Sequence, residues 1–314
     1  MTWIVTGGAG YIGSHVVRAL QRSGRRVAVV DDLSTGRESR VPPDVPFLRA
    51  DLSEAPIADW LREVGATGVV HVAGRKSPTE SMVDPLAYWR HNVTATTRVL
   101  EGMRAAGVAR IVFSSSCSVY GTPTAAADEG SPLAPESPYG HSKVAAERAI
   151  EQCGEAHGFG WVSLRYFNVA GSADPTLGDL GVHNLVPLAL QAVAAGRAPV
   201  IHGDDYPTPD GTCLRDYVHV EDLAEAHVAA VRALEEAHPG RVFNVGTGRP
   251  HSVREVLDVV ADVTGSGLVP VVGPRRAGDP AAVHAVVDRI RDELGWRPSR
   301  DLRDMVASAW AATV

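Results

Sequence analysis

Two residues four apart in the chain, Tyr139 and Lys143, have the types and the spacing to transfer a proton. Side chains four apart lie on one face of a helix, which would hold the lysine ammonium beside the tyrosine ring. A phenol has an ordinary pKa near ~10, so it acts as a base near neutral pH only where a nearby cation favours the phenolate. Ser116 follows the strand-like run 110–114 and could bond a substrate hydroxyl and relay its proton. The three residues predict an acid–base site, although a Tyr-x-x-x-Lys spacing and a serine-rich turn also occur without function.

Lysine is rare in this chain, because Lys76 and Lys143 are the only lysines among 30 basic residues. A compact ammonium can bond a ribose hydroxyl or a phenol where a forked guanidinium is too bulky. The rarity of lysine therefore marks both positions as candidates for function, the alternative being that the two lysines remained by chance.

A glycine-rich turn lies between the first apolar run and a helical stretch. Gly7, Gly10 and Gly13 leave room for a tight turn, for the approach of a pyrophosphate to the backbone, and for close packing of helix on strand. Tyr11 and Ile12 open the helix, whose first amides would face phosphate groups. The turn predicts a dinucleotide site, and a glycine-rich turn without a ligand is the alternative.

Acidic residues at the end of the second strand-like run indicate which dinucleotide binds. Asp31 stands where a carboxylate accepts both hydroxyls of the adenosine ribose, and Asp32 follows it. Because a carboxylate there repels a 2′-phosphate, we expect NAD rather than NADP. Asp51 and Leu52, after the short run 46–49, are candidates for contact with adenine, with a solvated loop acid as the alternative.

The elements that would position these residues alternate short β-branched runs with longer helical stretches, as in βαβ units. We expect strands at 3–6, 27–30, 46–49, 68–72, 110–114, 161–165 and 242–245, and helices at 12–23, at 87–106 and from 138. Right-handed crossovers between such strands build a doubly wound parallel sheet of the Rossmann type.

Two Pro- and Gly-rich stretches, 171–181 and 203–211, interrupt this alternation. Substrate lobes are often inserted at such interruptions. We therefore expect an α/β protein of two parts, an NAD-binding Rossmann domain and a smaller, discontinuous C-terminal α/β substrate lobe. Their expected bounds are 1–170 plus 213–246 for the domain and 171–212 plus 247–314 for the lobe.

The composition excludes several classes of protein. The 314 residues are 45% apolar and carry a net charge of −7, with no block of basic residues, so neither nucleic acid nor an anionic membrane is an expected partner. No apolar run approaches the ~20 residues that cross a bilayer, and no charged leader opens the chain, so we expect a cytoplasmic protein. Cys117, Cys153 and Cys213 form no Cys-x-x-Cys pair and predict neither a disulfide framework nor a metal site.

Taken together, these motifs resemble the extended short-chain dehydrogenases/reductases and, within them, the UDP-galactose (UDP-glucose) 4-epimerases. The resemblance extends over nearly the whole chain. It rests on 7–14, 31–36, Lys76 with Glu80 and Ser81, Asn92 with Val93, 113–121, 139–143, 164–168, 184–187, 203–220, 243–248 and 275–279. It implies NAD as cofactor, a UDP-sugar as substrate and a homodimer.

The resemblance also implies a role for each matching residue. Tyr139 would be the catalytic base and acid, Ser116 its proton-relaying neighbour, and Lys143 the partner of the phenolate and of the nicotinamide ribose. Lys76 and Asn92 would lie on the cofactor, and Lys76 would also reach the substrate. The UDP and the sugar would be held by Asn168, Asn184, Leu185, Arg215, Arg276 and Asp279. The implied reaction oxidises carbon 4 of a UDP-hexose to a ketone and reduces it again from the opposite face.

Departures from the family pattern leave the identity of the sugar open. His183 stands where the family often has an asparagine, and Val283 is small enough to leave room for an N-acetyl group, which makes UDP-GlcNAc an alternative. Arg75 and Ser77 could hold the carboxylate of UDP-glucuronate, a second alternative.

Two other kinds of function are less well supported by the residues. Dehydration needs an acidic pair directly after the relay serine, where this chain has Cys117 and Ser118. A non-catalytic NAD-sensing protein on the same fold is the remaining alternative, and the retention of Ser116, Tyr139 and Lys143 argues against it.

Overall fold

The computed structural model describes residues 1–181, 184–237, 240–276 and 278–313. The strands are β1 (Thr2–Thr6), β2 (Arg26–Asp31), β3 (Phe47–Arg49), β4 (Ala66–His71), β5 (Arg110–Ser116), β6 (Gly160–Tyr166), β7 (Asn168–Ala170), β8 (Val200–His202), β9 (Leu214–His219), β10 (Gly240–Val245), β11 (Pro250–Ser252), β12 (Val271–Gly273) and β13 (Ala282–Val283). The α-helices are α1 (Tyr11–Arg22), α2 (Ala58–Glu63), α3 (Pro78–Val83), α4 (Pro85–Tyr88), α5 (Ala95–Ala106), α6 (Pro138–His157), α7 (Leu185–Ala194), α8 (Val220–Glu236), α9 (Val253–Thr264), α10 (Asp288–Leu294) and α11 (Leu302–Ala311). The short 3₁₀ turns are η1 (Glu38–Arg40), η3 (Cys117–Val119) and η4 (Pro175–Leu177), and η2 (Trp89–Thr94) is a π-helical turn.

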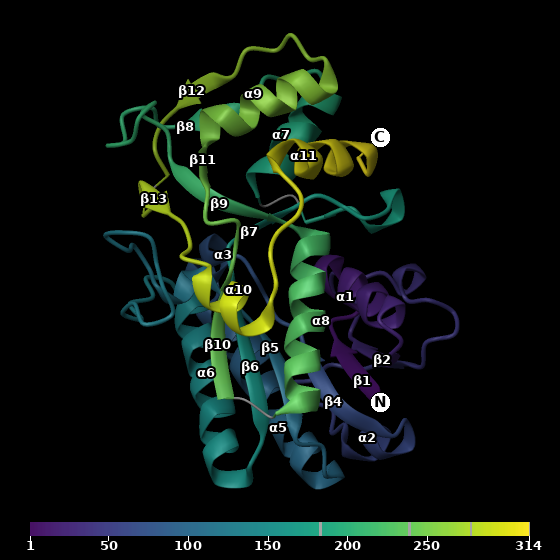
Figure 1. Ribbon diagram of the computed structural model, residues 1–314. Coiled ribbons are helices and arrows are strands. Elements are labelled where there is room, and N and C mark those ends of the chain that lie inside the picture. Colours follow the sequence, from purple (N-terminus) through teal and green to yellow (C-terminus); the bar gives the residue numbers. More distant parts are fainter. Residues whose placement is uncertain (182–183, 238–239, 277, 314) are drawn as a thin grey trace.

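A seven-stranded sheet with the order β10-β6-β5-β4-β1-β2-β3 forms the larger part of the molecule (Figure 1). All its strand pairs are parallel. The order reverses direction at β1, with β2 and β3 on one side and β4, β5, β6 and β10 on the other. The predicted doubly wound parallel sheet is confirmed, and the carboxyl ends of β1, β2, β4 and β5 share one edge.

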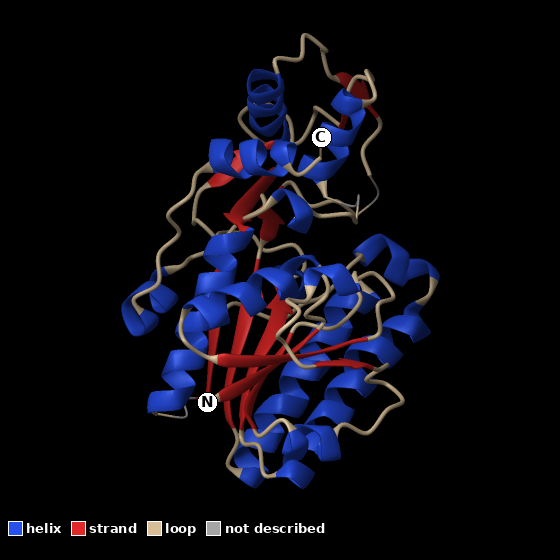
Figure 2. Ribbon diagram, turned by 90° about the vertical axis from the view of Figure 1, so that its right-hand side faces the viewer, coloured by secondary structure: helices blue, strands red, loops and turns tan. Residues whose placement is uncertain are grey.

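Buried side chains alternate between the two faces of this sheet, as the period of a strand requires. In β1, Trp3 and Val5 join the core beneath α1 and α8, whereas Ile4 joins the core beneath α2, α5 and α6. Figure 2 shows the helices on both sides of the sheet, with the smaller lobe above it. Parallel strands buried on both faces explain the near-continuous apolar runs in the sequence.

The single helix predicted over 87–106 is wrong in its detail. The chain forms α4, the π-helical turn η2 and then α5. Pro85, capped by the Asp84 side chain, starts the helical run two residues before the predicted start. The π turn adds a residue to the helical repeat, and it holds Asn92 with its side chain buried.

A second sheet with the order β11-β9-β13, in which β7 also pairs with β9, lies beyond the carboxyl edge of the first sheet (Figure 1). Helices α7, α9 and α11 pack around it in a separate apolar core. Strand β9 belongs to this second sheet, whereas α8, which follows it directly, packs against α1 and the large sheet. The exact division of the chain into two parts stays a prediction.

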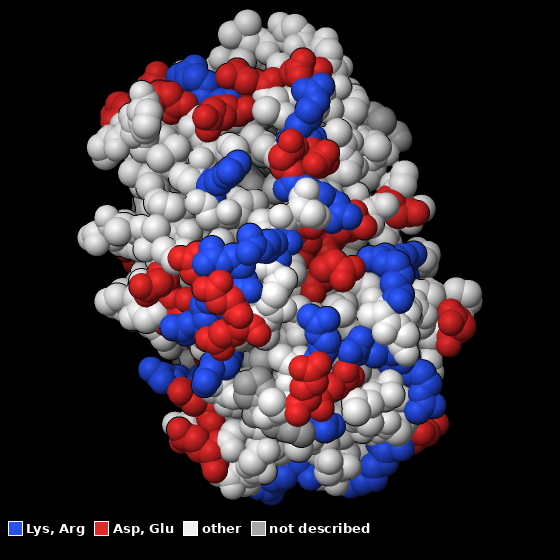
Figure 3. Space-filling view, in the orientation of Figure 1, with Lys and Arg blue, Asp and Glu red and all other residues white. Residues whose placement is uncertain are grey.

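No helix in the described ranges combines the length and the apolar character that a membrane span requires. On the face drawn in Figure 3, basic and acidic side chains alternate over the surface without a large area of one sign. This distribution gives no extended basic surface on that face.

Candidate active site

The start of α6 sets the position of Tyr139. Ser137 caps the helix, because its hydroxyl accepts a hydrogen bond from Gly140 N at 3.2 Å, and Pro138 occupies the first helical position. Tyr139 and Lys143 therefore lie one turn apart on the buried face of α6, and each is only 5% exposed. The predicted pairing of the two side chains on one helix face is present in the structure.

The Tyr139 phenol lies at the carboxyl edge of the large sheet. It contacts the Ser116 hydroxyl, and its ring packs edge-on against Tyr88, with 6.1 Å between the ring centroids. Burial raises the pKa of Tyr139, while the hydrogen bond with Ser116 lowers it. This net direction is opposite to the one expected from the sequence, because the loss of solvent around the phenol outweighs the hydrogen bond with Ser116.

Lys143 is held on three sides. Its Nζ donates to Ser114 O at 2.8 Å, lies 4.9 Å from the centroid of the Phe113 ring and lies 6.0 Å from that of Tyr139. Burial lowers the pKa of Lys143 to about 8, and the Glu147 carboxylate opposes this shift. Near neutral pH the ammonium is therefore mostly charged and fixed beside the phenol.

Glu147 was not among the predicted site residues. It is four residues after Lys143 on the same face of α6, and its carboxylate accepts from Arg165 Nε at 2.9 Å and from Arg165 Nη2 at 2.6 Å. The Ser115 hydroxyl donates to the same carboxylate at 2.5 Å. Both members of the ion pair are buried, which gives Lys143 a fixed negative charge one turn away. The signal was present in the i, i+4 spacing, but the partner on β6 could not be read from it.

The glycine turn forms a cradle at the neighbouring strand ends. Gly7 has a φ of 69°, and a Cβ there would lie 2.8 Å from Ala73 N in the loop after β4. A Cβ at Gly13 would collide with Gly7 O. Glycine at both positions therefore lets the turn pack closely on the loop after β4 and on the first turn of α1, whose amides point toward the edge of the sheet. The turn thus fits the diphosphate of a dinucleotide.

Asp31 closes this cradle at the end of β2. Its carboxylate is buried and accepts from Ala9 N at 2.9 Å and from Leu33 N at 2.8 Å. Leu33 has a φ of 62°, a strained conformation for a residue with a side chain. Burial raises the pKa of Asp31, while these two amide bonds lower it. Each carboxylate oxygen keeps a free lone pair, so the pair of ribose hydroxyls fits here as well.

The loop after β4 lies between the glycine cradle and the helix α6 that carries Tyr139 and Lys143. The Asn92 amide accepts from Arg75 N at 2.8 Å, donates to Arg75 O at 3.1 Å and donates to Ser142 Oγ at 2.9 Å. It thereby fixes this loop against α6. Lys76, in the same loop, places Nζ 5.7 Å from the centroid of the Tyr11 ring and 3.4 Å from the Asp179 carboxylate. Contacts of Asn92 and Lys76 with a cofactor stay predictions.

Four other predicted cofactor residues also make contacts within the protein. Asp32 accepts from Ser34 N at 2.8 Å, and Asp51 accepts from Ser53 N at 2.8 Å, so each holds its own turn. Leu52 is buried in the core beneath α2 and α5, and Ile12 packs against the core beneath α1 and α8. Contacts of these four residues with a cofactor stay predictions.

The residues predicted to hold the UDP and the sugar, other than Lys76, Ser116 and Tyr139, lie on the second sheet and on the elements beside it. Arg215 in β9 pairs with the Asp279 carboxylate, and its strand is in register with Val283 of β13. The Arg215 charge also acts on the Cys117 thiol directly after Ser116, which places it near the catalytic turn. The other members of the predicted set lie as follows: Asn168 opens β7, Asn184 precedes α7, Leu185 opens α7 and packs on the lobe core, and Arg276 is exposed.

The structure shows the surroundings of two residues that depart from the family pattern, Val283 and Cys117. Val283 is 7% exposed and packs with Val119, Tyr120 and Phe167 between the two parts of the molecule. Burial raises the pKa of Cys117 to about 12, so its thiol is protonated and unsuited to attack. His183 lies outside the described residues.

The sheet, the glycine cradle and the Ser116, Tyr139 and Lys143 cluster define a dinucleotide-binding protein of the short-chain dehydrogenase/reductase class. The family model described as "NAD dependent epimerase/dehydratase family" matches residues 3–246. The chain belongs to this NAD dependent epimerase/dehydratase family.

Individual relatives and solved structures show which members of this family the chain is similar to. A UDP-glucose 4-epimerase from Streptomyces lividans is 45% identical over 323 residues, which cover 98% of this chain and 94% of that protein. The crystal structure of a UDP-glucose 4-epimerase from Stenotrophomonas maltophila, with bound NAD and formylated UDP-arabinopyranose, has a TM-score of 0.95 at 36% identity and covers 99% of this chain and 97% of its own. The UDP-Glc/GlcNAc 4-epimerase from Campylobacter jejuni has a TM-score of 0.88 at 36% identity, with 98% of both chains covered. The predicted resemblance to the UDP-glucose 4-epimerases is confirmed.

Proposed function

We propose that this protein interconverts UDP-glucose and UDP-galactose by NAD-dependent 4-epimerisation, through a transient 4-keto sugar. One observation carries the proposal: a buried Ser116, Tyr139 and Lys143 cluster shares its sheet edge with the glycine cradle. The loop after β4 contacts both, since it packs on Gly7 and approaches Lys143 at Gly74. A sugar carbon placed between cradle and phenol would meet the cofactor and the base together.

The chain's own residues divide the work of the reaction. Tyr139 takes the proton of the 4-hydroxyl as carbon 4 is oxidised and returns it as carbon 4 is reduced. Ser116 bonds the same hydroxyl, and Lys143 keeps a positive charge beside the phenol. When bound, NAD supplies the hydride acceptor and donor for carbon 4 and adds a second positive charge to the site. That second charge opposes the effect of burial on the Tyr139 phenol.

Binding of the cofactor and the substrate follows from the placement of the remaining residues. The cradle amides and Asp31 suit the diphosphate and a ribose without a 2′-phosphate, which favours NAD. Arg215 carries a guanidinium fork near the catalytic turn, a geometry suited to the UDP diphosphate once its pair with Asp279 opens. Asp279, Arg276, Asn168, Asn184 and the opening turn of α7 at Leu185 complete the proposed UDP-sugar site. Lys76 reaches both ligands in this proposal.

The local contacts weigh against two alternative reactions. Arg75 pairs with Glu80 at 2.9 Å and Ser77 caps α3, so both groups suggested for a glucuronate carboxylate are already engaged. Dehydration lacks its acidic pair, because Cys117 and Ser118 carry a thiol and a hydroxyl in place of two carboxyl groups, and Ser118 N is bonded to Ser116 Oγ at 3.1 Å. UDP-GlcNAc remains an alternative substrate, since Val283 is small and lies in register with Arg215.

A homodimer is a second part of the proposal. Met82, Val83, Leu86 and Trp89 expose 42–85% of their surface on the consecutive elements α3, α4 and η2. These elements pack on α6, so a second copy covering them would bury the apolar side chains and support the helix that carries Tyr139. We expect Leu86→Asp to shift the sedimenting species from dimer to monomer, and a wild-type chain that sediments as a monomer would refute this part.

A cytoplasmic location of the protein stays a prediction.

A substrate panel tests the reaction. The purified protein is analysed for bound NAD and then given UDP-galactose, UDP-GalNAc and UDP-galacturonate in separate assays. We expect about one NAD per chain and turnover of UDP-galactose, with UDP-galacturonate the poorest substrate. Bound NAD without turnover of any UDP-hexose would instead favour an NAD-sensing protein.

A further inference from the structure

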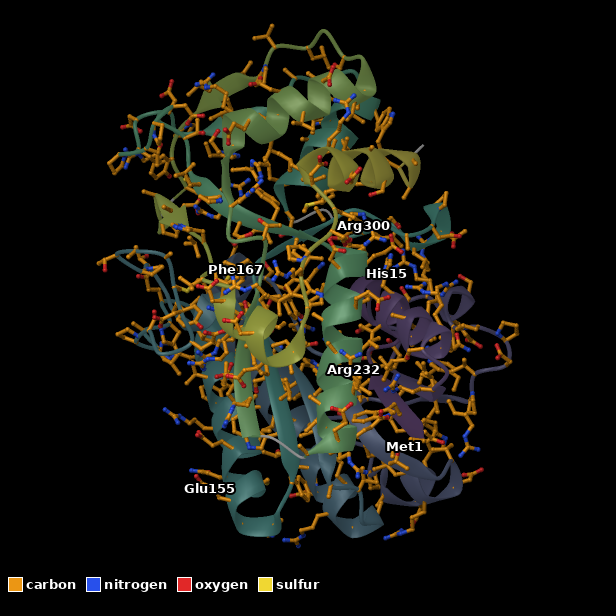
Figure 4. All side chains as sticks on the ribbon, in the orientation of Figure 1. Met1, His15, Glu155, Phe167, Arg232 and Arg300 are labelled. Atoms are coloured by element: carbon orange, nitrogen blue, oxygen red, sulfur yellow. The ribbon has the colours of Figure 1, made fainter. Side chains whose placement is uncertain are left out.

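A segment of the smaller lobe crosses the cradle that the large sheet provides for a dinucleotide. The segment, 171–181, leaves the end of β7 and runs over the amino-terminal end of α1 (Figure 1). Tyr11 Oη donates to Gly171 O at 2.6 Å, and Ala173 N donates to His15 Nε2 at 3.0 Å. Figure 4 places His15 at the end of α1 that faces the smaller lobe.

The same segment is fastened from two further strand ends. Arg40, after β2, donates from Nη2 to Gly178 O at 2.5 Å. Lys76, after β4, pairs with the Asp179 carboxylate at 3.4 Å. One segment is thus tied to η1 after β2, to the first turns of α1 after β1 and to the loop after β4, which surround the cradle.

Arg40 is the least expected of these attachments. Arg40 is only 3% exposed. Among the described residues its guanidinium forms no ion pair, and its buried Nε has no hydrogen-bond partner. Burying a guanidinium whose carboxylate neighbour, Asp179, lies too far for an ion pair is costly, and the group that offsets this cost is the carbonyl of Gly178 in the segment. The contact of Arg40 is made with the segment, which points to a role in holding the segment down.

We propose that Arg40 is a positioning residue for cofactor retention, which fastens segment 171–181 across the cradle so that NAD leaves only when this segment opens. The proposal rests on the proposed function and extends it to the exchange of the cofactor. Retention matters for this reaction, because loss of the reduced cofactor during the cycle would leave the keto sugar stranded. Tyr11, His15 and Lys76 also fasten the segment, and Arg40 is the attachment made by a buried guanidinium, whose one side-chain hydrogen bond in the described part of the chain goes to Gly178 O in this segment.

The test measures how fast bound NAD exchanges. The holoenzyme is mixed with an excess of isotopically labelled NAD, and the rate at which the label enters the protein is followed in the wild type, Arg40→Met, Arg40→Lys and Arg22→Met. Methionine keeps the apolar stem without the charge. Arg22 is a matched control, because it lies on α1 with its side chain 52% exposed and paired with Glu225.

We expect the Arg40→Met variant to exchange NAD roughly 10- to 100-fold faster than the wild type, the range given by losing a hydrogen bond from a charged donor. Arg40→Lys should fall between the two, since an ammonium can still reach a carbonyl, and Arg22→Met should match the wild type. Deuterium uptake at the amides of 171–181 should rise in Arg40→Met. An unchanged exchange rate, or uptake that rises evenly along the chain, would overturn the proposal while leaving the epimerase function standing. A wild-type chain that binds no NAD would overturn both.

Discussion

Replacing Glu147 by Gln tests whether the negative charge one turn beyond Lys143 sets the pH range over which the lysine is protonated. The substitution removes the negative charge but keeps a side chain of nearly the same shape. At about 6 Å, the spacing of side chains four apart on a helix, and an effective dielectric constant of about 20, a unit charge contributes about 2.8 kcal/mol, or about two pKa units. This is an upper limit, so we expect the pKa of Lys143 to fall from about 8 to between ~6 and ~7.

The rate should fall at alkaline pH, because the site requires the protonated form of Lys143. A lower pKa means that Lys143 loses its proton at lower pH, so the alkaline limb of the rate profile moves to lower pH. At pH 8 the charged fraction would fall from about one half to between ~1% and ~9%, a loss of roughly 5- to 50-fold in rate, whereas at pH 6 the rate would change by less than about twofold.

The assay follows UDP-galactose turnover from pH 6 to pH 9, at 25 °C and equal NAD content. The temperature matters because Arg165 loses its buried carboxylate partner, and breaking such a pair costs about 3–5 kcal/mol of stability. Glu151→Gln is the matched control, since Glu151 lies one turn further along α6 in a surface pair with Arg148. An alkaline limb that is the same in Glu147→Gln and the wild type would refute the reasoning.

Three further predictions concern the cofactor, the sugar and the thiol. Asp31→Asn should weaken NAD binding by roughly 10- to 100-fold, because the ribose loses a charged acceptor, and unchanged occupancy in equilibrium dialysis would contradict the contact. UDP-GlcNAc should turn over within about tenfold of UDP-glucose, because Val283 leaves room for the N-acetyl group, and a preference against it of more than about 100-fold would remove that idea. Cys117→Ala should keep the wild-type turnover within about threefold and its pH profile, because the buried thiol is protonated, whereas a loss of about 100-fold would show that the thiol takes part.

Features that depend on local sequence were predictable. The strands of the large sheet lie within a few residues of their expected bounds, because parallel strands buried on both faces leave apolar runs between turns. The spacing of Tyr139 and Lys143 sufficed to place them together, since the helix period alone determines which face they share. Gly7 and Gly13 likewise require close approach of backbone, which is a local property of the turn.

Features that depend on distant partners were not predictable. Glu147 meets Arg165 across α6 and β6, and Arg40 meets Gly178 across 138 residues of chain. The direction of the Tyr139 pKa also depends on the surroundings, because burial is set by the elements that pack over the ring. The π-helical turn at Asn92 depends in the same way on the loop that its amide holds.

The most direct test of the catalytic proposal is the turnover of UDP-galactose by Tyr139→Phe, compared with the wild type at equal NAD content. The change removes one hydroxyl from a ring whose packing against Tyr88 is otherwise kept. We expect about one NAD per chain in both proteins and a rate lower by about 10²- to 10⁴-fold in the variant, the range for losing a general acid–base group. Turnover at the wild-type rate in Tyr139→Phe would contradict the account.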